Sequence, residues 1–298
     1  MIIPVPQELP IIKEVRIENT NACGFKCIFC PREKMDRKQG VQSINDFSLV
    51  LERVEEYIGG KFCKTVYLHG YGEPLLDKNL IQKAKLCKER WPNSRPLIIT
   101  TLGYKLEPSY IEQLICCGLF EIQVSFYGSD KKTYMDHAAV DRFDLAFQNL
   151  KLLSEYKKKY SSPTIIKVKK RIINLRETMD QPNRGSFLNE LKKLDNIKIS
   201  NIGLHNFGNG RDYAKSKKLL CDRAIKRNLL QVTWDLNIVP CCFDYNSEEK
   251  WGNLRDMSLK DIFLSERSTK FVKDHCEENA DVYSICKNCT MRCSTKIS

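Results

Sequence analysis

Residues 14–31 read EVRIENTNACGFKCIFCP, and this stretch determines the fold that the rest of the chain is expected to build. It starts with a β-rich run at 14–18 and continues directly into a loop with three cysteines, Cys23, Cys27 and Cys30. In parallel α/β folds the loops after the strands converge on one crevice, where active sites collect. The cysteine loop is therefore expected at the functional end of a parallel sheet.

Short β-rich runs alternate with amphipathic helical runs from about residue 11 to 205. The other expected strands are 65–69, 97–101, 121–126, 164–173 and 197–204. The expected helices, with apolar residues at three- and four-residue spacing, are 47–58, 79–91, 108–117, 142–160 and 184–194. This alternation predicts a parallel sheet with helices on its outer face. It suits a doubly wound sheet and a partial (β/α) barrel equally, and composition does not choose between them.

Length and composition favour a globular protein. With 298 residues and 42% hydrophobic content, the chain can build one large domain and a small appendage, which excludes wholesale disorder. It contains no run of about 18 apolar residues, so no membrane span is expected. The first ten residues carry no signal-peptide pattern, and a cytoplasmic location is therefore expected.

The charge is strongly basic, with 49 Lys and Arg against 37 Asp and Glu and a formal net charge of +12. The basic residues are spread along helical stretches such as 151–159, and no basic ribbon interleaved with aromatic residues is present. Solvated helix faces explain most of the excess, so nucleic-acid binding is disfavoured. The excess could still attract a phosphorylated or otherwise acidic substrate.

The chain has 14 cysteines, a large number for a reducing compartment in which disulfides do not persist. Metal ligation or redox chemistry is therefore the better explanation for most of them. They gather at 23–30 and again at 221–293. The isolated ones stand in apolar or helical patterns and are expected to be buried as small hydrophobic side chains: Cys63, Cys87, Cys116 and Cys117.

The first cysteine group suits an iron–sulfur cluster. Three thiolates on one short loop can bind three irons of a four-iron cluster. No fourth cysteine is near, so one iron would be open to another ligand. Zinc is the alternative, because Cys27-x2-Cys30 is a common zinc-binding pair, but it would need a further ligand. His69 is the only early candidate for that ligand.

The motif Cys-x3-Cys-x2-Cys, with Phe29 before its last cysteine, resembles the signature loop of the radical S-adenosylmethionine (SAM) superfamily. After the second strand, residues 70–74 read GYGEP and resemble that family's Gly-Gly-Glu-Pro motif, with Tyr71 in place of the usual first glycine. The resemblance implies that this segment meets the methionine amino group of SAM. The residues carried over to that role are Gly72, Glu73 and Pro74.

Two further strand ends match the family. Thr101 belongs to a Thr-Thr-Leu-Gly segment where family members often have Thr-Asn-Gly, and Ser125 matches a position that often contacts the SAM carboxylate. Asn174 or Arg171 on the fifth strand could help there. Each residue alone has an ordinary structural explanation, but their order on successive strand ends favours the family. The implied fold is α/β, a partial (β/α)6 TIM barrel over about residues 11–205.

The pattern changes after about residue 206. A turn-rich linker at 205–210 leads to an expected strand pair at 229–235 and 237–241, a helix near 259–264, and a tail dense in cysteine. This segment has too few apolar residues for its own core, so a metal site is expected to replace one. The predicted division is a barrel core at 1–210 and a small cysteine-rich auxiliary-cluster domain at 211–298.

The tail resembles the auxiliary-cluster extensions called SPASM and twitch domains. It has a hairpin ending in Pro240-Cys241, a Gly252-Asn253 turn before a helix, and a closing Cys-x2-Cys. The full SPASM spacing lacks its x5 step here, so the single-cluster twitch arrangement fits better. The implied ligands of a second, auxiliary [4Fe–4S] cluster are Cys221, Cys241, Cys286 and Cys289. Zinc remains the alternative for four thiolates.

Three cysteines of the tail are left over. Cys242, on a strand beside Cys241, would point the opposite way. It could be a spare ligand, a packed thiol, or a donor of a hydrogen atom to a substrate radical, as in radical SAM epimerases with a similar Cys-Cys pair. Cys276 and Cys293 could complete a further cluster or replace the chosen ligands.

The resemblance implies an enzyme that cleaves SAM reductively at its SAM-binding [4Fe–4S] cluster. The product is a 5′-deoxyadenosyl radical, which abstracts a hydrogen atom from a substrate. Oxidation or epimerisation of a polar small molecule, a sugar, an aminocyclitol or a related metabolite, is the favoured reaction, because the short N-terminus lacks a leader-peptide domain. The expected partner is an external one-electron donor such as flavodoxin or ferredoxin.

Two alternatives remain open. One is a maturase that crosslinks, oxidises or epimerises a ribosomally made peptide, whose acidic leader could dock on the basic protein. The other is a non-catalytic iron–sulfur or zinc protein. The motifs identify no substrate-binding residue, but several polar side chains near the strand ends or the tail could face the cavity: His69, Tyr127, His137, His205 and Asp244.

Overall fold

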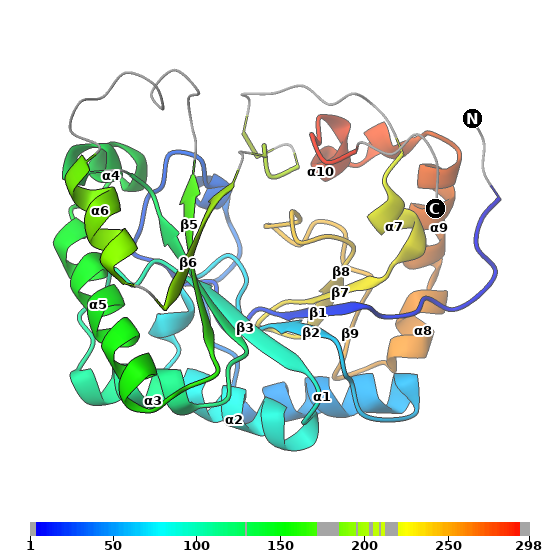
Figure 1. Cartoon of the computed structure of the whole chain (residues 1–298). Helices are drawn as coiled ribbons and strands as arrows, with labels where there is room; N and C mark the ends of the chain where they lie inside the picture. Colours follow the sequence, from blue (N-terminus) through cyan, green and yellow to red (C-terminus); the bar gives the residue numbers. More distant parts are fainter. Residues whose placement is uncertain are drawn as a thin grey trace.

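The computed structural model describes residues 4–128, 130–171, 185–194, 196–202, 205–208, 210–211 and 220–292. Within these ranges one sheet has the strand order β6-β5-β4-β3-β2-β1-β7-β8-β9 (Figure 1). The strands are β1 Glu14–Ile17, β2 Thr65–Tyr67, β3 Arg95–Thr100, β4 Glu121–Phe126, β5 Ile165–Arg171, β6 Ile197–Ile202, β7 Leu229–Val232, β8 Asn237–Val239 and β9 Gly252–Asn253. The helices are α1 Ile44–Ile58, α2 Leu80–Arg90, α3 Pro108–Cys116, α4 Lys131–Ala138, α5 Phe143–Lys159, α6 Gly185–Lys193, α7 Asp222–Lys226, α8 Leu259–Leu264, α9 Glu266–Cys276 and α10 Ser284–Lys287.

The strand order decides between the two folds that the sequence left open. Strands β1 to β6 are parallel and adjacent in chain order. Because right-handed crossovers that always step in one direction place their helices on one face, the sheet curves around its other face. A doubly wound sheet would instead reverse direction at a switch point. Figure 1 shows α1, α2, α3 and α5 outside the curve, so the partial (β/α)6 barrel is confirmed.

Helix α1 illustrates how local sequence builds this layer. Ser43 caps its N-terminus by accepting a hydrogen bond from the Asp46 amide, and Gly59 ends it with a left-handed φ of 65°. Its apolar stripe of Phe47, Val50, Leu51 and Val54 is fully buried against the sheet. Each such side chain contributes about 1.5–3 kcal/mol to folding through burial.

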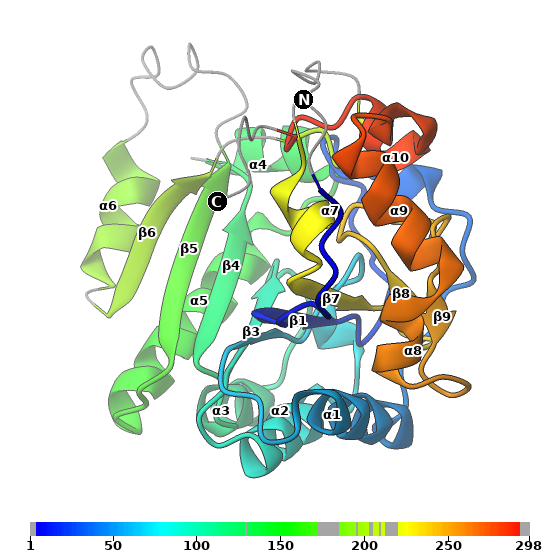
Figure 2. The ribbon, with the colours of Figure 1, turned by 90° about the vertical axis from the view of Figure 1, so that its right-hand side faces the viewer.

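The C-terminal hairpin continues the barrel sheet, which the sequence did not predict. Strand β7 pairs in parallel with β1, with Glu14 opposite Leu229 and Ile17 opposite Val232, and β8 and β9 then add antiparallel edges (Figure 2). This pairing covers the edge of β1 that β2 leaves open. The division of the chain at residues 210 and 211 stays a prediction.

Several local features differ from expectation. Helix α4 was not expected; Asp130 and Thr133 form a capping box at its start. Helices α7, α9 and α10 were also missed. Cys87 and Cys117 are buried as predicted, but the prediction was wrong for Cys63 and Cys116, which are exposed because one lies in the loop before β2 and the other on the solvent side of α3.

Within the described ranges, none of the helices combines the length and the apolar character that crossing a lipid bilayer requires.

Candidate functional site

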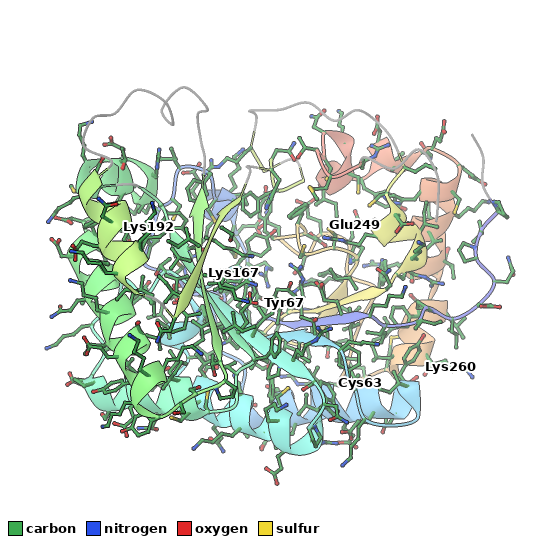
Figure 3. The ribbon with its side chains drawn as sticks, viewed as in Figure 1. Cys63, Tyr67, Lys167, Lys192, Glu249 and Lys260 are labelled. Carbon is green, nitrogen blue, oxygen red and sulfur yellow. The ribbon has the colours of Figure 1, made fainter. Side chains whose placement is uncertain are left out.

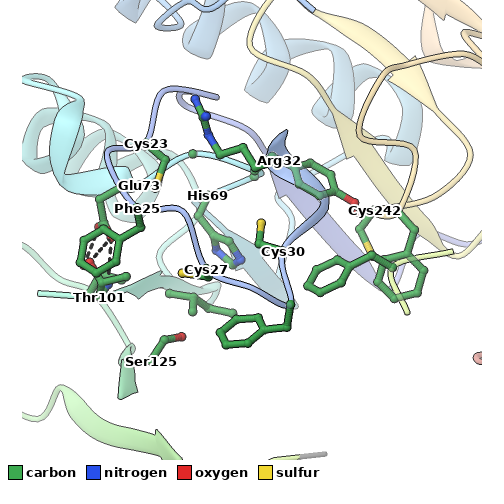
Figure 4. A pocket seen from close by; sticks show the side chains of 18 of the residues that line it. Cys23, Phe25, Cys27, Cys30, Arg32, His69, Glu73, Thr101, Ser125 and Cys242 are labelled. Atoms are coloured by element: carbon green, nitrogen blue, oxygen red, sulfur yellow. Dashed lines mark hydrogen bonds between the residues drawn. The ribbon is translucent and has the colours of Figure 1, made fainter. Parts of the chain in front are cut away.

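A cavity of about 230 Å³ lies at the carboxyl ends of the first four strands. It is lined by the three cysteines of the first loop, by Phe29, Gly72, Glu73, Thr101 and Ser125, and by Cys242 from the C-terminal segment. Figure 4 shows the side chains of the three loop cysteines, Glu73, Thr101, Ser125 and Cys242 around one space. The fold therefore brings together residues that the sequence selected from four strand ends and from the tail.

The cysteine loop is held by aromatic anchors between its cysteines. Phe29 is buried, and its ring lies 4.8 Å from that of Tyr127. The amide of Ile28 donates to the carbonyl of His137 at the end of α4 (3.1 Å), and the amide of Cys30 donates to the carbonyl of Cys27 (3.0 Å). Phe25 and Phe29 are buried and line the cavity beside Cys23, Cys27 and Cys30, whose sulfurs face it (Figure 4), whereas Ile28 is exposed.

The donor set fits an iron–sulfur cluster. The described cysteines form no disulfide, and the three loop thiols surround one cavity. In the described part of the chain, no three Cys, His, Asp or Glu side chains converge on the point that a single metal ion would occupy. Cluster thiolates do not need to converge in this way, because each binds a different iron.

Glu73 ties the motif after β2 to the end of β3. Its carboxylate accepts hydrogen bonds from the Thr100 hydroxyl (2.5 Å) and from the amide (2.9 Å) and hydroxyl (2.8 Å) of Thr101 (Figure 4). Its own amide donates to the carbonyl of Ala22 in the cysteine loop (2.8 Å). Burial raises the pKa of Glu73, and these hydrogen bonds oppose the rise. The carboxylate therefore shapes the loop, and Pro74 starts a buried 3-10 turn behind it.

Gly72 allows the motif loop to approach the cysteine loop. A Cβ atom at this position would overlap the carbonyl oxygen of Thr20 and lie 2.7 Å from that of Ala22. Both neighbours are backbone atoms, which cannot rotate away. Only glycine fits this contact.

We predict that Gly72→Ala separates the motif loop from the cysteine loop. The overlap with backbone should lower the free energy of unfolding by about 1–3 kcal/mol and reduce the iron retained after anaerobic reconstitution. Gly60→Ala is the matched control, because a Cβ there meets no atom within 4 Å. Equal iron content and unfolding midpoints in the two variants would contradict this account.

Glu18, directly after β1, joins four segments through one buried carboxylate. It pairs with both terminal nitrogens of Arg37 (2.9 Å each) and accepts the amides of Tyr71 and Trp234 (3.2 Å each). Arg37 also donates to the carbonyl of Tyr245 (2.6 Å). The end of β1, the chain after the cysteine loop, the motif loop and the C-terminal segment are thereby fixed to one another.

Glu18→Gln should destabilise the whole arrangement, because it leaves the guanidinium of Arg37 buried without its counter-charge. The expected loss in the free energy of unfolding is about 3–5 kcal/mol, measured by chemical denaturation. The control is Glu56→Gln, which removes an ion pair of Arg53 whose carboxylate side is 48% exposed and should cost less than about 1 kcal/mol. Similar losses in both variants would rule out the proposed role of Glu18.

The predicted auxiliary cysteines form a second group. Burial raises the pKa of Cys286, and the nearby Cys221 and Cys289 raise it further. The pKa of Cys241 is also raised. The largest cause is its hydrogen bond to Cys242, followed by burial, and the nearby Cys221 contributes as well. The four thiols that the sequence selected are thus near one another, which fits a thiolate-bound cluster in this segment.

Two side chains beside this group were missed in the sequence. Nε2 of His275 lies 3.4 Å from the sulfur of Cys286, and Arg292 donates to the Cys286 carbonyl (3.1 Å). His275 lies on α9, and no motif marks either residue. Cys276 is buried in a separate apolar cluster with Leu220, Ile225 and Val272. Cys293 and Asn174 lie outside the described residues.

Cys242 does not point away from Cys241, so that prediction was wrong. Strand β8 ends at Val239, and the chain turns before the two cysteines. Their thiols are hydrogen-bonded to each other, and this bond lowers the pKa of Cys242. The positive charges of the nearby Arg16 and Arg223 lower the same pKa. The Tyr71 hydroxyl donates to the Cys242 carbonyl (2.5 Å), and Arg223 contacts its sulfur at 3.7 Å.

The other polar candidates separate into two sets. His69, Tyr127 and His205 line the cavity. His137 instead contacts the carbonyl of Tyr127 through Nδ1 (2.5 Å), and Asp244 accepts the amides of Glu248 and Glu249 (2.8 and 3.0 Å). These last two side chains are therefore engaged in local structure.

A partial parallel barrel with a three-cysteine loop after β1, and with Cys242 of the C-terminal segment at the same cavity, has the features of an iron–sulfur protein. The model of the radical SAM superfamily matches residues 17–181, more than half of the chain, and that of the SPASM iron–sulfur cluster-binding domain matches 221–290. The chain belongs to the radical SAM superfamily. It is a radical SAM enzyme whose cofactors are SAM, the [4Fe–4S] cluster that binds it, and an auxiliary iron–sulfur cluster.

The chain is 23% identical over 275 residues to the S-adenosyl-L-methionine-dependent 2-deoxy-scyllo-inosamine dehydrogenase of Niallia circulans, covering 92% of this chain and 91% of that protein. It is 30% identical over 145 residues to a probable GTP 3′,8-cyclase of Sulfurisphaera tokodaii. That match covers 47% of this chain and 42% of the cyclase, so it extends over less than half of either protein.

Solved structures share the fold. BtrN in complex with AdoMet and 2-DOIA superimposes with a TM-score of 0.64 at 20% identity, covering 97% of this chain and 96% of BtrN. Histidine-tagged anSMEcpe with bound AdoMet gives 0.63 at 16% identity, over 95% and 87% of the two chains. Streptococcus suis SuiB bound to S-adenosylmethionine gives 0.60 at 16% identity, over 89% and 68%.

Proposed function

We propose that this enzyme abstracts a hydrogen atom from a polar small molecule, a sugar, an aminocyclitol or a related metabolite, and oxidises or epimerises it. The observation that carries the proposal is one cavity lined both by the family's SAM-motif residues and by Cys242 of the auxiliary segment. A substrate in this cavity would lie between the two cofactor sites. Similarity along nearly the whole chain to a SAM-dependent dehydrogenase of an aminocyclitol supports the same proposal.

In this proposal Cys23, Cys27 and Cys30 hold the SAM-binding [4Fe–4S] cluster. The backbone around Gly72 and Glu73 receives the amino group of SAM, and Thr101, Ser125 and Asn174 complete the SAM site. Cys221, Cys241, Cys286 and Cys289 hold an auxiliary [4Fe–4S] cluster. When bound and reduced by an external one-electron donor, the cofactors supply a 5′-deoxyadenosyl radical.

The protein's part is to orient the substrate and exclude water. Aromatic rings at the auxiliary side of the cavity contact one another: Tyr71 and Phe207 at 6.5 Å, and Phe207 and Phe243 at 5.8 Å between centroids. All three line the cavity. Such a wall shields a reactive species from solvent and from unwanted hydrogen donors.

Cys242 is the proposed hydrogen-atom donor if the reaction is an epimerisation. Its side chain lines the cavity on the side of the auxiliary segment, whereas Glu73 and Thr101 line it from the motif loop and the end of β3. A thiol in this place could return a hydrogen atom to the face of a substrate radical that is turned away from SAM. In an oxidation the auxiliary cluster would instead accept the second electron.

The cofactor content tests the assignment of the clusters. We expect about eight irons per chain after anaerobic reconstitution, and about four in a variant with Cys23, Cys27 and Cys30 replaced by Ala. A variant with Cys63, Cys87 and Cys116 replaced is the control and should keep the full content, because these thiols lie outside both groups. Zinc in place of iron in either group would overturn the assignment for that group.

The reaction is tested by screening sugars and aminocyclitols for those that stimulate 5′-deoxyadenosine formation. For an epimerase acting on such a substrate in D2O, the wild-type product should carry deuterium at the inverted carbon. Cys242→Ala should still cleave SAM but lose this product by at least about a hundredfold, that is, about 2.7 kcal/mol. Cys276→Ala, in the apolar cluster, is the control. Normal inverted product from Cys242→Ala would remove Cys242 from the mechanism, and stimulation by no small molecule would contradict the proposed function.

A further inference from the structure

A row of polar side chains crosses the inner face of the barrel beside the cavity. Arg16 on β1 stands level with Tyr67 on β2 and with Gln231 on β7. His69 follows two residues after Tyr67 and therefore faces the same way. Arg16, His69 and Gln231 all line the cavity. Figure 3 shows Tyr67 within the curve of the sheet, and Figure 4 shows His69 beside the cysteine loop.

Arg16 is held rigidly but keeps unused donors. Its Nε donates to Glu14, and its guanidinium lies 4.3 Å from the centre of the Tyr67 ring. Among the described residues its two terminal nitrogens have no hydrogen-bond partner, and the side chain is 19% exposed. A guanidinium fixed along one edge and open along the other is suited to bind a carboxylate or phosphate with two parallel hydrogen bonds.

His69 is a second group that lacks a partner. Its Nδ1 is buried and has no hydrogen-bond partner in the described part of the chain. Burial first, and then the positive charges of Arg16 and Lys169, lower the pKa of His69 to about 3. The imidazole is therefore neutral at physiological pH and can bond a hydroxyl group. A buried polar atom without a partner is costly, so a ligand is expected to satisfy it.

The charges around this wall favour an anion. The carboxylates near the cavity are already engaged: Glu14 with Arg16, Glu18 with Arg37, and Glu73 with the threonines of β3. Arg16 shares its charge with Glu14 through Nε, but its two terminal nitrogens remain able to donate. Among the residues that the structure describes, the terminal nitrogens of Arg16 can therefore bond an anion, whereas no carboxylate of this wall is left to bond an ammonium group of a substrate.

We propose that the wall formed by Arg16, His69 and Gln231 is a substrate subsite for an anionic group, a carboxylate or a phosphate, with Arg16 as its anchor. His69 and Gln231 bond hydroxyl groups next to the anion. The inference rests on the proposed function, because it assumes that the substrate enters this cavity. Within the favoured class of substrates it selects acidic or phosphorylated sugars over amino sugars.

Arg16 could instead serve only to balance the negative charge of the auxiliary segment, since it lies near the Cys242 thiol. The two roles predict different results. An anchor affects the binding of acidic ligands and leaves the clusters unchanged. A charge-balancing residue changes the spectrum of the auxiliary cluster and leaves ligand selectivity unchanged.

The experiment measures binding of four pyranoses of similar size to the anaerobic holoenzyme with SAM bound. The probes are glucose, glucosamine, glucuronate and glucose 6-phosphate, so that the last two distinguish a carboxylate site from a phosphate site. At least one acidic probe should bind about ten- to a hundredfold more tightly than glucose, and glucosamine should bind most weakly. Arg16→Gln should remove this preference, whereas Arg16→Lys should keep part of it.

The controls separate failure of the subsite from failure of the fold or of the function. Arg267→Gln changes an exposed arginine on α9 and should leave all four affinities unchanged. The iron content and the electron paramagnetic resonance spectrum of each variant show whether the clusters are intact. Equal binding of the four probes, a preference that survives in Arg16→Gln, or no binding of the acidic probes at millimolar concentration overturns the inference. SAM cleavage, measured separately, tests the proposed function whichever way the binding result falls.

Discussion

The buried carboxylate of Glu18 sets the relative positions of the loops that form the site. A charged group that leaves water must be paired and hydrogen-bonded, and Glu18 meets this requirement only if Arg37, Tyr71 and Trp234 all reach it. The barrel strand, the motif loop and the C-terminal segment are thereby held together. Gly70 belongs to the same constraint, because a Cβ there would overlap the Glu18 side chain.

The C-terminal segment acts as part of the barrel as well as a carrier of cysteines. Because β7 pairs with β1, the turn after β8 reaches the carboxyl ends of the strands, where the Tyr71 hydroxyl holds the Cys242 carbonyl. The tyrosine that replaces a glycine of the family motif thus links the motif loop to the C-terminal segment. One cavity can consequently serve two cofactor sites.

The charged side chains of the protein include many on its surface and a few inside the barrel. Many of the lysines stand on exposed helix faces, such as Lys192 on α6 and Lys260 on α8 (Figure 3), where solvent and salt screen them. Arg16, Lys169 and the neutral His69 lie where screening is weak. A few interior charges can therefore select a ligand that the net charge of +12 only attracts from a distance.

The sequence by itself determined the alternation of six strands with helices, the cysteine loop, and the motif residues Glu73, Thr101 and Ser125. These features could be predicted because periodicity and motif spacing are local properties of the chain. It also selected four auxiliary cysteines that the fold brings near one another. Only the tertiary structure decided that the sheet is a barrel, that β7 lies beside β1, and that Arg16 and His69 share a wall with Cys242. These features depend on hydrogen bonds between segments far apart in the chain, such as Glu18 and Trp234, which are 216 residues apart. Such pairings follow from packing and charge compensation in three dimensions, and no local pattern encodes them.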